Sequence, residues 1–149
     1  MIARLPVTMA LSALLASATS IPVGRGSKPA DTAPPYFLLH GVTAQTGGAP
    51  FSDLNEDSSL VYQVTSVSGP DPATPDSHGV ADQAEWMADK ARTAILGRDP
   101  GTGLWLHQLT IPGVRVIGRS LDTEPGGTSD QSDAIMSYVQ RFRFDLTST

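Results

Sequence analysis

The three histidines are the first candidates for metal or acid–base chemistry, but their spacing favours neither. His40, His78 and His107 are widely separated, and none lies within five residues of another. A metal site built from neighbouring ligands would need closer spacing. His40 falls in an apolar run and is predicted to be a core or edge residue of a strand. We therefore expect no metal site and no bound cofactor.

Two short motifs imitate binding loops without completing them. Residues 53–57 (Asp-Leu-Asn-Glu-Asp) resemble the start of a calcium loop, but Ser58 stands where that loop needs Gly, and Val64 stands where it needs Glu. Gly24-Arg25-Gly26 is followed by Pro29 instead of a further glycine. No strand is predicted before it, so it does not fit a dinucleotide or phosphate loop. Both segments are predicted to be ordinary loops or helix caps.

Nucleophilic chemistry is equally poorly supported. The chain has no cysteine, which excludes a disulfide scaffold, a zinc–thiolate site, an iron–sulfur cluster and a cysteine nucleophile. It contains neither Gly-x-Ser-x-Gly nor His-Glu-x-x-His. Its aspartates fall mostly in predicted loops with no visible partner for acid–base work. We predict that the protein is not an enzyme.

The composition indicates one lightly charged domain that spans residues 1–149. Hydrophobic residues make up 40% and charged residues 17%, with 14 Gly and 12 Pro, so long loops are expected. Ten basic and 15 acidic residues leave a net charge of −5. Lys28 and Lys90 are the only lysines, which argues against stable nucleic-acid binding.

The N-terminal segment admits two interpretations. One basic residue, Arg4, precedes an apolar run, and Ala16-Ser17-Ala18 resembles a signal-peptidase site. The alternative is an amphipathic helix that begins near Pro6 and aligns Leu11, Leu14, Leu15 and Ala18 on one face. The helix is favoured, and the run is too short and interrupted to span a membrane.

The remaining pattern alternates strands, loops and one clear helix. Residues 82–96 form the helix, with Asp82 as N-cap, an apolar stripe at Ala84, Met87, Ala91 and Ile95, and a stop at Gly97. Residues 104–111 are a short apolar segment around Trp105. The predicted strands are residues 36–42, 60–67, 113–121 and 134–146, and the predicted loops include 22–35, 43–59, 69–79 and 122–133.

This order predicts an α+β fold. A mixed or antiparallel sheet of four to five strands would carry both helices on one face. Even spacing predicts that Arg115 and Arg119 share a strand face, and alternation puts Arg141 and Arg143 together opposite Phe142 and Phe144. The uncovered face would then present Arg115, Arg119, Arg141 and Arg143 beside valines. We interpret it as a candidate assembly interface, with an ordinary solvated face as the alternative.

Several stretches in order resemble the lambda-type tail terminator proteins of long-tailed (siphovirus) phages, especially those of actinobacteria. The most specific pair is the Tyr-Gln-Val-Thr-Ser strand at 62–66 and the Gln-Ala-Glu-Trp helix that begins at Gln83. Supporting pieces are residues 1–7, 22–24, 35–36, 113–116, 124–127 and the Arg-Phe-Arg-Phe strand at 141–144. The proline-rich segment 69–79 departs from that pattern, so its role is open.

The resemblance implies a structural subunit of the virion, assembled in the host cytoplasm and placed at the head–tail junction. Such proteins form a ring, typically a hexamer. The ring caps the major tail tube protein, stops tube growth and docks the head completion or connector protein, while DNA passes through the lumen without specific binding. No catalytic residue, cofactor or membrane contact is implied. The alternatives are another neck connector or completion protein, or a secreted bacterial domain with a cleaved signal peptide.

Overall fold

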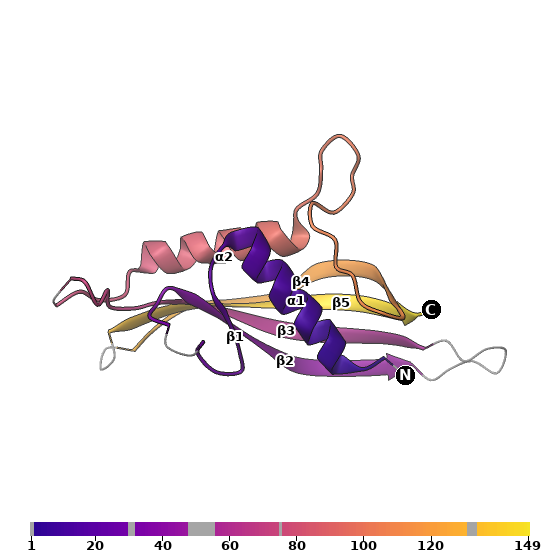
Figure 1. The fold of residues 1–149 in the computed structure, drawn as a ribbon, viewed down its shortest axis with the longest axis horizontal. Coiled ribbons are helices and arrows are strands. Elements are labelled where there is room, and N and C mark those ends of the chain that lie inside the picture. The colour runs from indigo at the N-terminus through magenta and orange to yellow at the C-terminus, as the bar shows by residue number, and fades with distance from the viewer. Residues whose placement is uncertain (1, 30–31, 48–55, 75, 131–133) are drawn as a thin grey trace.

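In residues 2–29, 32–47, 56–74, 76–130 and 134–149, which the computed structural model describes, two helices and five strands follow one another along the chain. Their order is α1 (Arg4–Thr19), β1 (Val23–Arg25), β2 (Tyr36–Gly47), β3 (Asp57–Ser68), α2 (Ala81–Leu96), β4 (Val114–Asp130) and β5 (Ile135–Ser148). Figure 1 shows both helices lying along one side of a long, twisted sheet. The predicted α+β class is confirmed.

The strands form one mixed sheet in the order β1-β2-β3-β5-β4. β1 runs parallel to β2, and every other neighbouring pair is antiparallel. Consecutive strands β2 and β3 pair with each other, as do β4 and β5, and α2 lies in the connection between the two pairs. β3 and β5 lie next to each other inside the sheet. Their outward side chains therefore form the middle of the sheet face that the helices leave uncovered.

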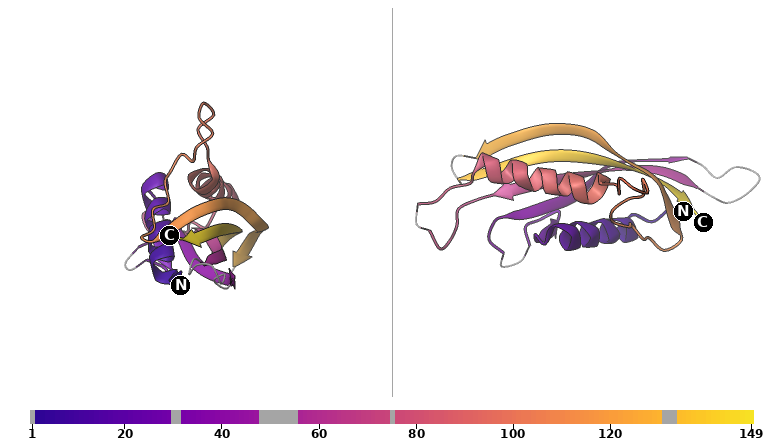
Figure 2. Two further views of the ribbon diagram at one scale, coloured as in Figure 1. Left: turned by 90° about the vertical axis from the view of Figure 1, so that its right-hand side faces the viewer. Right: turned by 90° about the horizontal axis from the view of Figure 1, so that it is seen from above.

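Both helices lie on the same face of the sheet (Figure 2), and the hydrophobic core is formed by side chains of the helices and the sheet. α1 contributes Val7, Leu11, Leu14 and Leu15, which confirms that the N-terminal segment is a helix with this apolar face. α2 buries the predicted stripe of Ala84, Met87, Ala91 and Ile95. The inner face of the sheet supplies Phe37, Leu39, Leu60, Tyr62, Val64, Phe142, Phe144 and Leu146. No helix in the described part of the chain is long and apolar enough to cross a membrane.

The start of α2 differs from the predicted N-cap at Asp82. The helix begins at Ala81, its N-cap is Val80, and the N-cap side chain makes no capping hydrogen bond. Instead, the Val80 amide donates to Ser68 Oγ at 3.0 Å, and Ser68 donates to the Gln83 side chain. The amide of the N-cap residue is thus bonded by a hydroxyl at the end of β3, and Asp82 lies inside the first turn of the helix.

Three predicted loops are partly strand. Residues 23–25 form β1, β2 continues to Gly47 while β3 starts at Asp57, and β4 runs to Asp130 through the predicted loop 122–133. β4 is an edge strand, and its register shifts between Thr123 and Gly126, around Pro125. A proline is tolerated at such an edge bulge because its missing N–H interrupts no central ladder. Residues 69–74 and 76–79 form no helix or strand, as predicted for this segment. Residue 75 lies outside the described residues.

Candidate assembly surface

The outer face of the sheet lies opposite both helices, and its centre is a polar ladder across β3 and β5. Gln63 on β3 pairs with Arg141 on β5 in the strand register. Arg141 Nε donates to Gln63 Oε1 at 3.1 Å, and Gln63 Nε2 donates to Thr65 Oγ1 at 3.3 Å. These bonds join the Arg141 side chain to β3 while it stays partly exposed. The predicted outward direction of Arg141 is confirmed.

A second cluster lies one step along the same face. Arg143 Nε donates to Asp145 Oδ1 at 3.1 Å, and Arg143 Nη2 donates to Ser59 Oγ at 3.1 Å. Ser59 also donates a short hydrogen bond to the same carboxylate oxygen. The Ser59 hydroxyl, and secondarily Arg143, hold the pKa of Asp145 below its usual range. The Arg143 and Asp145 side chains keep 47% and 41% of their surface exposed, so the ion pair remains available to a partner.

The rest of this face carries both charged and apolar side chains, as the sequence predicted. Arg115 is exposed near the start of β4, opposite Thr147. Val61 and Val139 are half-buried between the polar groups. A shallow depression of about 170 Å³ is lined by Thr43, Gln45, Ser59, Val61, Asp122 and Arg143. Arg115, Arg141 and Arg143, from two adjacent strands, are therefore brought to one uncovered surface.

Arg119 does not belong to this surface, and the sequence prediction for it is wrong. The register of β4 against β5 shifts between Val116 and Gly118, so Ile117 is an extra residue. A bulge of this kind reverses which later side chains face inward. Arg119 consequently lies opposite Phe144, on the helix-covered face, and only 8% of its surface is exposed.

Arg119 of β4 instead contacts the end of α2 and the segment that contains Trp105 and His107. Its Nη1 donates to the main-chain oxygen of Ile95 at 3.1 Å, and its Nη2 donates to that of His107 at 2.9 Å. Its guanidinium carbon lies 4.8 Å from the centre of the Trp105 ring. Burial lowers the pKa of Arg119 because the charged form loses hydration. Arg119 therefore stabilises the fold and does not belong to the candidate assembly surface.

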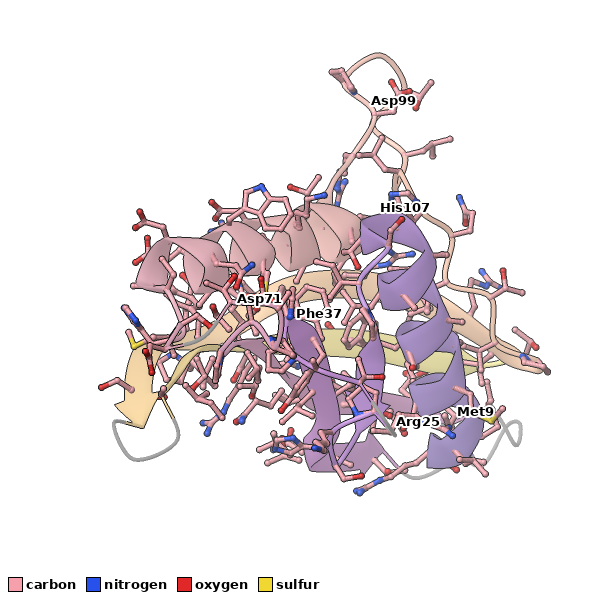
Figure 3. The ribbon with its side chains drawn as sticks, turned by 60° about the vertical axis from the view of Figure 1, so that its left-hand side comes forward. Met9, Arg25, Phe37, Asp71, Asp99 and His107 are labelled. Atoms are coloured by element: carbon pink, nitrogen blue, oxygen red, sulfur yellow. The ribbon has the colours of Figure 1, made fainter. Side chains whose placement is uncertain are left out.

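A projecting hairpin, residues 97–106, is a feature that sequence reasoning missed; we call it the arm. Arg98 and Trp105 form an antiparallel bridge, and Leu106 donates its amide to Gly97 at 2.9 Å. Asp99 Oδ1 accepts the amides of Gly101 and Thr102, which closes the tip. The arm stands away from the sheet in Figure 1, and Figure 3 shows Asp99 at its outer end and His107 at its base. The Asp-Pro-Gly turn at 99–101 was the available signal.

The described residues contain no group of three or more His, Asp or Glu side chains that could hold a metal ion. His40 is exposed on β2, His78 is exposed before α2, and His107 lies at the base of the arm. Of the imitation calcium loop, Asp53, Leu54 and Asn55 lie outside the described residues, while Asp57 begins β3. Gly24 and Arg25 lie in β1, a strand edge and not a phosphate loop.

Comparison with known proteins finds similarity among solved structures. No protein-family model matches the sequence, and no curated protein matches it. Among solved structures, the chain is similar to a chain of the virion of a native gene transfer agent particle. The TM-score is 0.51 at 16% sequence identity, and the match covers 93% of this chain and 84% of that one. At this identity, the match shows a shared fold.

Proposed function

We propose that this protein is a structural component of a phage virion, and specifically the tail terminator of a long-tailed phage. The observation that carries the proposal is the fold shared with a virion chain over nearly the full length of both molecules. The ordered sequence resemblance, above all the 62–66 strand and the helix beginning at Gln83, supports the narrower assignment. The described residues also contain no group of side chains that could hold a catalytic metal ion.

A terminator must close into a ring, which requires two different patches on each subunit that bind one another. The outer sheet face provides one such patch, since Arg115, Arg141 and Arg143 are exposed or half-buried there and no helix covers them. Partly paired arginines suit this role, because bidentate recognition of carboxylates needs a held, planar guanidinium. We propose a six-membered ring whose subunits contact the major tail tube protein on one side and the head completion protein on the other.

The charge of the chain fits passage of DNA through such a ring. With a net charge of −5, six copies would present an acidic assembly overall. A basic lumen would retain DNA by counterion release, whereas an acidic one lets it slide through during ejection. The proposal therefore includes DNA as a transient passenger and not as a bound ligand.

Immunogold labelling of purified virions tests the proposal. An antibody against this protein is expected to label the head–tail junction alone. Label along the tail or at its tip, or no label at all, would reject the terminator assignment.

Label at the junction would leave a neighbouring neck connector as the competing interpretation. Deletion of the gene separates the two. Loss of a terminator should yield tails of uncontrolled length, whereas loss of a connector should yield tails of normal length that lack heads.

A further inference from the structure

The sheet has two open edges, one on each side. In the described part of the chain, β4 is the outermost strand on one side and pairs only with β5 (Figure 2). On the other side, β1 covers β2 at residues 37–39. No described strand pairs with the outer side of β2 over residues 40–47, and every residue of this stretch except Ala44 is exposed. Each edge therefore offers main-chain donors and acceptors to a further strand.

The free edge of β2 has few of the features that normally keep such an edge from pairing. Residues 40–47 read His-Gly-Val-Thr-Ala-Gln-Thr-Gly, without proline and without Asp, Glu, Lys or Arg. One register shift, between Gly41 and Thr43, interrupts the strand. Exposed edges are usually protected by charges, proline and several bulges. We therefore expect another strand to cover residues 40–47 when the protein is assembled.

Charges of opposite sign stand at the two ends of the β2 edge. Arg25, the last residue of β1, and Lys28 are exposed beside its start, where the Gly26 amide donates to the Leu39 oxygen at 2.9 Å. Asp57 of β3 is exposed at the other end, opposite the last residue of β2. The edge is thus basic where it begins and acidic where it ends.

The edge of β4 has the same order of charge along its own chain. Arg115 is exposed near the start of the strand, and Asp122 and Glu124 are exposed further along it. Arg119, the remaining charged residue between them, is buried. The Gln140 side chain donates to Glu124 Oε1 at 3.0 Å, which holds this carboxylate at the strand. Residues 115–124 are therefore basic first and acidic later.

The charges at both edges lack ionic partners within the chain. The six residues that take part in no ion pair with the described residues are Arg25, Lys28, Asp57, Arg115, Asp122 and Glu124. Asp31 lies outside the described residues. Unpaired charges of opposite sign on two open edges favour a contact between these edges, because each set would neutralise the other.

We propose that residues 40–47 of β2 pair antiparallel with residues 115–124 of β4 in a neighbouring copy of this chain. The partner is a second copy because β4 of this same chain carries the complementary charges in the complementary order. In this arrangement, the acidic part of β4 meets the basic start of the β2 edge, and Arg115 lies across Gly47 from Asp57. Parallel pairing would bring like charges together.

The sheet itself supplies the direction and register of this contact. β2 is antiparallel to β3, β3 to β5 and β5 to β4, so β2 and β4 already run in opposite directions. One row across the sheet joins Thr43 to Val61, Val61 to Arg143 and Arg143 to Ser120. Copies placed side by side without a shift along the strands would therefore bring Ser120 of one copy beside Thr43 of the next.

The extent of the contact is limited at the end where β1 begins. Beyond Glu124, the neighbour's strand reaches Pro125 and a register shift, where it leaves the ladder before it meets β1. Because the contact joins two unlike edges, it is of the kind that closes rings. The inference deepens the proposed function and rests on it for the ring, whereas the contact itself is measured on the purified protein.

The chain has no cysteine, so a disulfide placed across the contact tests it directly. Thr43→Cys and Ser120→Cys are prepared as separate single variants, mixed and oxidised at high protein concentration, so that a disulfide between them joins two molecules. A tag on one variant separates this product from the two homodimers by size. The matched control mixes Thr43→Cys with Thr128→Cys, because Thr128 is exposed on the same strand beyond Pro125. Circular dichroism verifies the fold of each variant.

Charge reversal tests whether the two edges recognise each other. Arg25→Glu with Lys28→Glu, added to the position-43 variant, should lower the 43/120 product several-fold, because the reversed edge repels the acidic part of β4. Asp122→Lys with Glu124→Lys, added to the position-120 variant, should restore the product. The reactions are run at low ionic strength, where screening is weak.

The control for charge is Lys90→Glu with Arg98→Glu, which changes the net charge equally on α2 and on the arm and should leave the yield unchanged. Equal 43/120 and 43/128 yields, or a 43/120 excess that the reversal at β1 leaves unchanged, would overturn the proposal. Junction label in virions with equal yields would remove the edge contact alone. A charge-dependent 43/120 excess without junction label would retain the contact and remove the terminator assignment.

Discussion

Arg119 donates a hydrogen bond from Nη2 to the main-chain oxygen of His107, 2.9 Å away, and so joins β4 to the base of the arm. Its Nη1 bonds Ile95 at the end of α2 in the same way. One buried side chain thus joins β4 to both the end of α2 and the base of the arm.

The first prediction concerns Arg119. Arg119→Ala should lower the free energy of unfolding by about 2–4 kcal/mol, because two charge-assisted hydrogen bonds disappear and buried carbonyls lose their partners. Urea denaturation measures the change. Arg115→Ala, on the exposed face of the same strand, is the matched control and should change stability by less than about 0.5 kcal/mol. Similar losses for the two variants would show that Arg119 is not anchored as described.

The second prediction concerns Tyr62, whose hydroxyl lies 2.7 Å from Thr8 Oγ1 and whose ring packs edge-to-face on Phe144. Burial raises the pKa of Tyr62 above its ordinary value of 10.0, against the opposing effects of Thr8 and Arg4. The folded state therefore resists ionisation, and the associated stability is present below pH 10 and lost as the pH rises above it. Tyr62→Phe should cost about 1 kcal/mol at neutral pH, and its stability should decline less than that of the wild type in alkaline solution.

Denaturation curves at matched pH values provide the test. The comparison uses the difference between the two proteins, which removes the contribution of the other tyrosines. If the wild type and Tyr62→Phe lost stability in parallel above pH 10, Tyr62 would not be the buried titrating group.

The third prediction concerns the second cluster on the outer face, formed by Ser59, Arg143 and Asp145. The Ser59 hydroxyl is the main cause of the lowered pKa of Asp145. Ser59→Ala should therefore raise the pKa of Asp145 toward its ordinary value of 3.8. In the wild type, stability linked to this carboxylate is present above pH 3.8 and lost as the pH falls through the lower folded pKa.

Carboxyl-carbon NMR titration measures the pKa of Asp145 directly. Ser120→Ala is the control, since Ser120 is an exposed serine on the neighbouring strand β4. An unchanged Asp145 pKa in Ser59→Ala would contradict the assigned hydrogen bond.

The fourth prediction concerns the proposed assembly face. Reversing Arg141 and Arg143 to Glu should leave the fold intact, because Arg143 makes an exposed ion pair, worth about 0–1 kcal/mol, and Arg141 makes a hydrogen bond to the Gln63 side chain. It should impair ring closure or docking on the tail tube, because opposite charge would then meet a surface that suits arginine. Tail length by electron microscopy and plaque titre are the measurements. Arg92→Glu, on the exposed side of α2, is the control, and normal tails and titre in the double reversal would exclude the face as an interface.

Local pattern alone determined much of the fold. The alternation in β5 predicted that Phe142, Phe144 and Leu146 point to the core while Arg141 and Arg143 point away, and the structure confirms it. The apolar stripe of α2 and the buried face of α1 were equally predictable. These features repeat with the period of a single element, so they need no knowledge of the neighbouring element.

The position of Arg119, the cap of α2 and the short strand β1 were decided only by tertiary structure. A single bulge at Ile117 reverses the facing of Arg119, and no local pattern marks where the register slips. The Val80 amide bonds Ser68, twelve residues earlier, because the sheet brings that hydroxyl to the helix. β1 has only three residues and forms by pairing with β2. Each of these depends on a partner distant in sequence, whereas the pattern that sequence reasoning uses records only near neighbours.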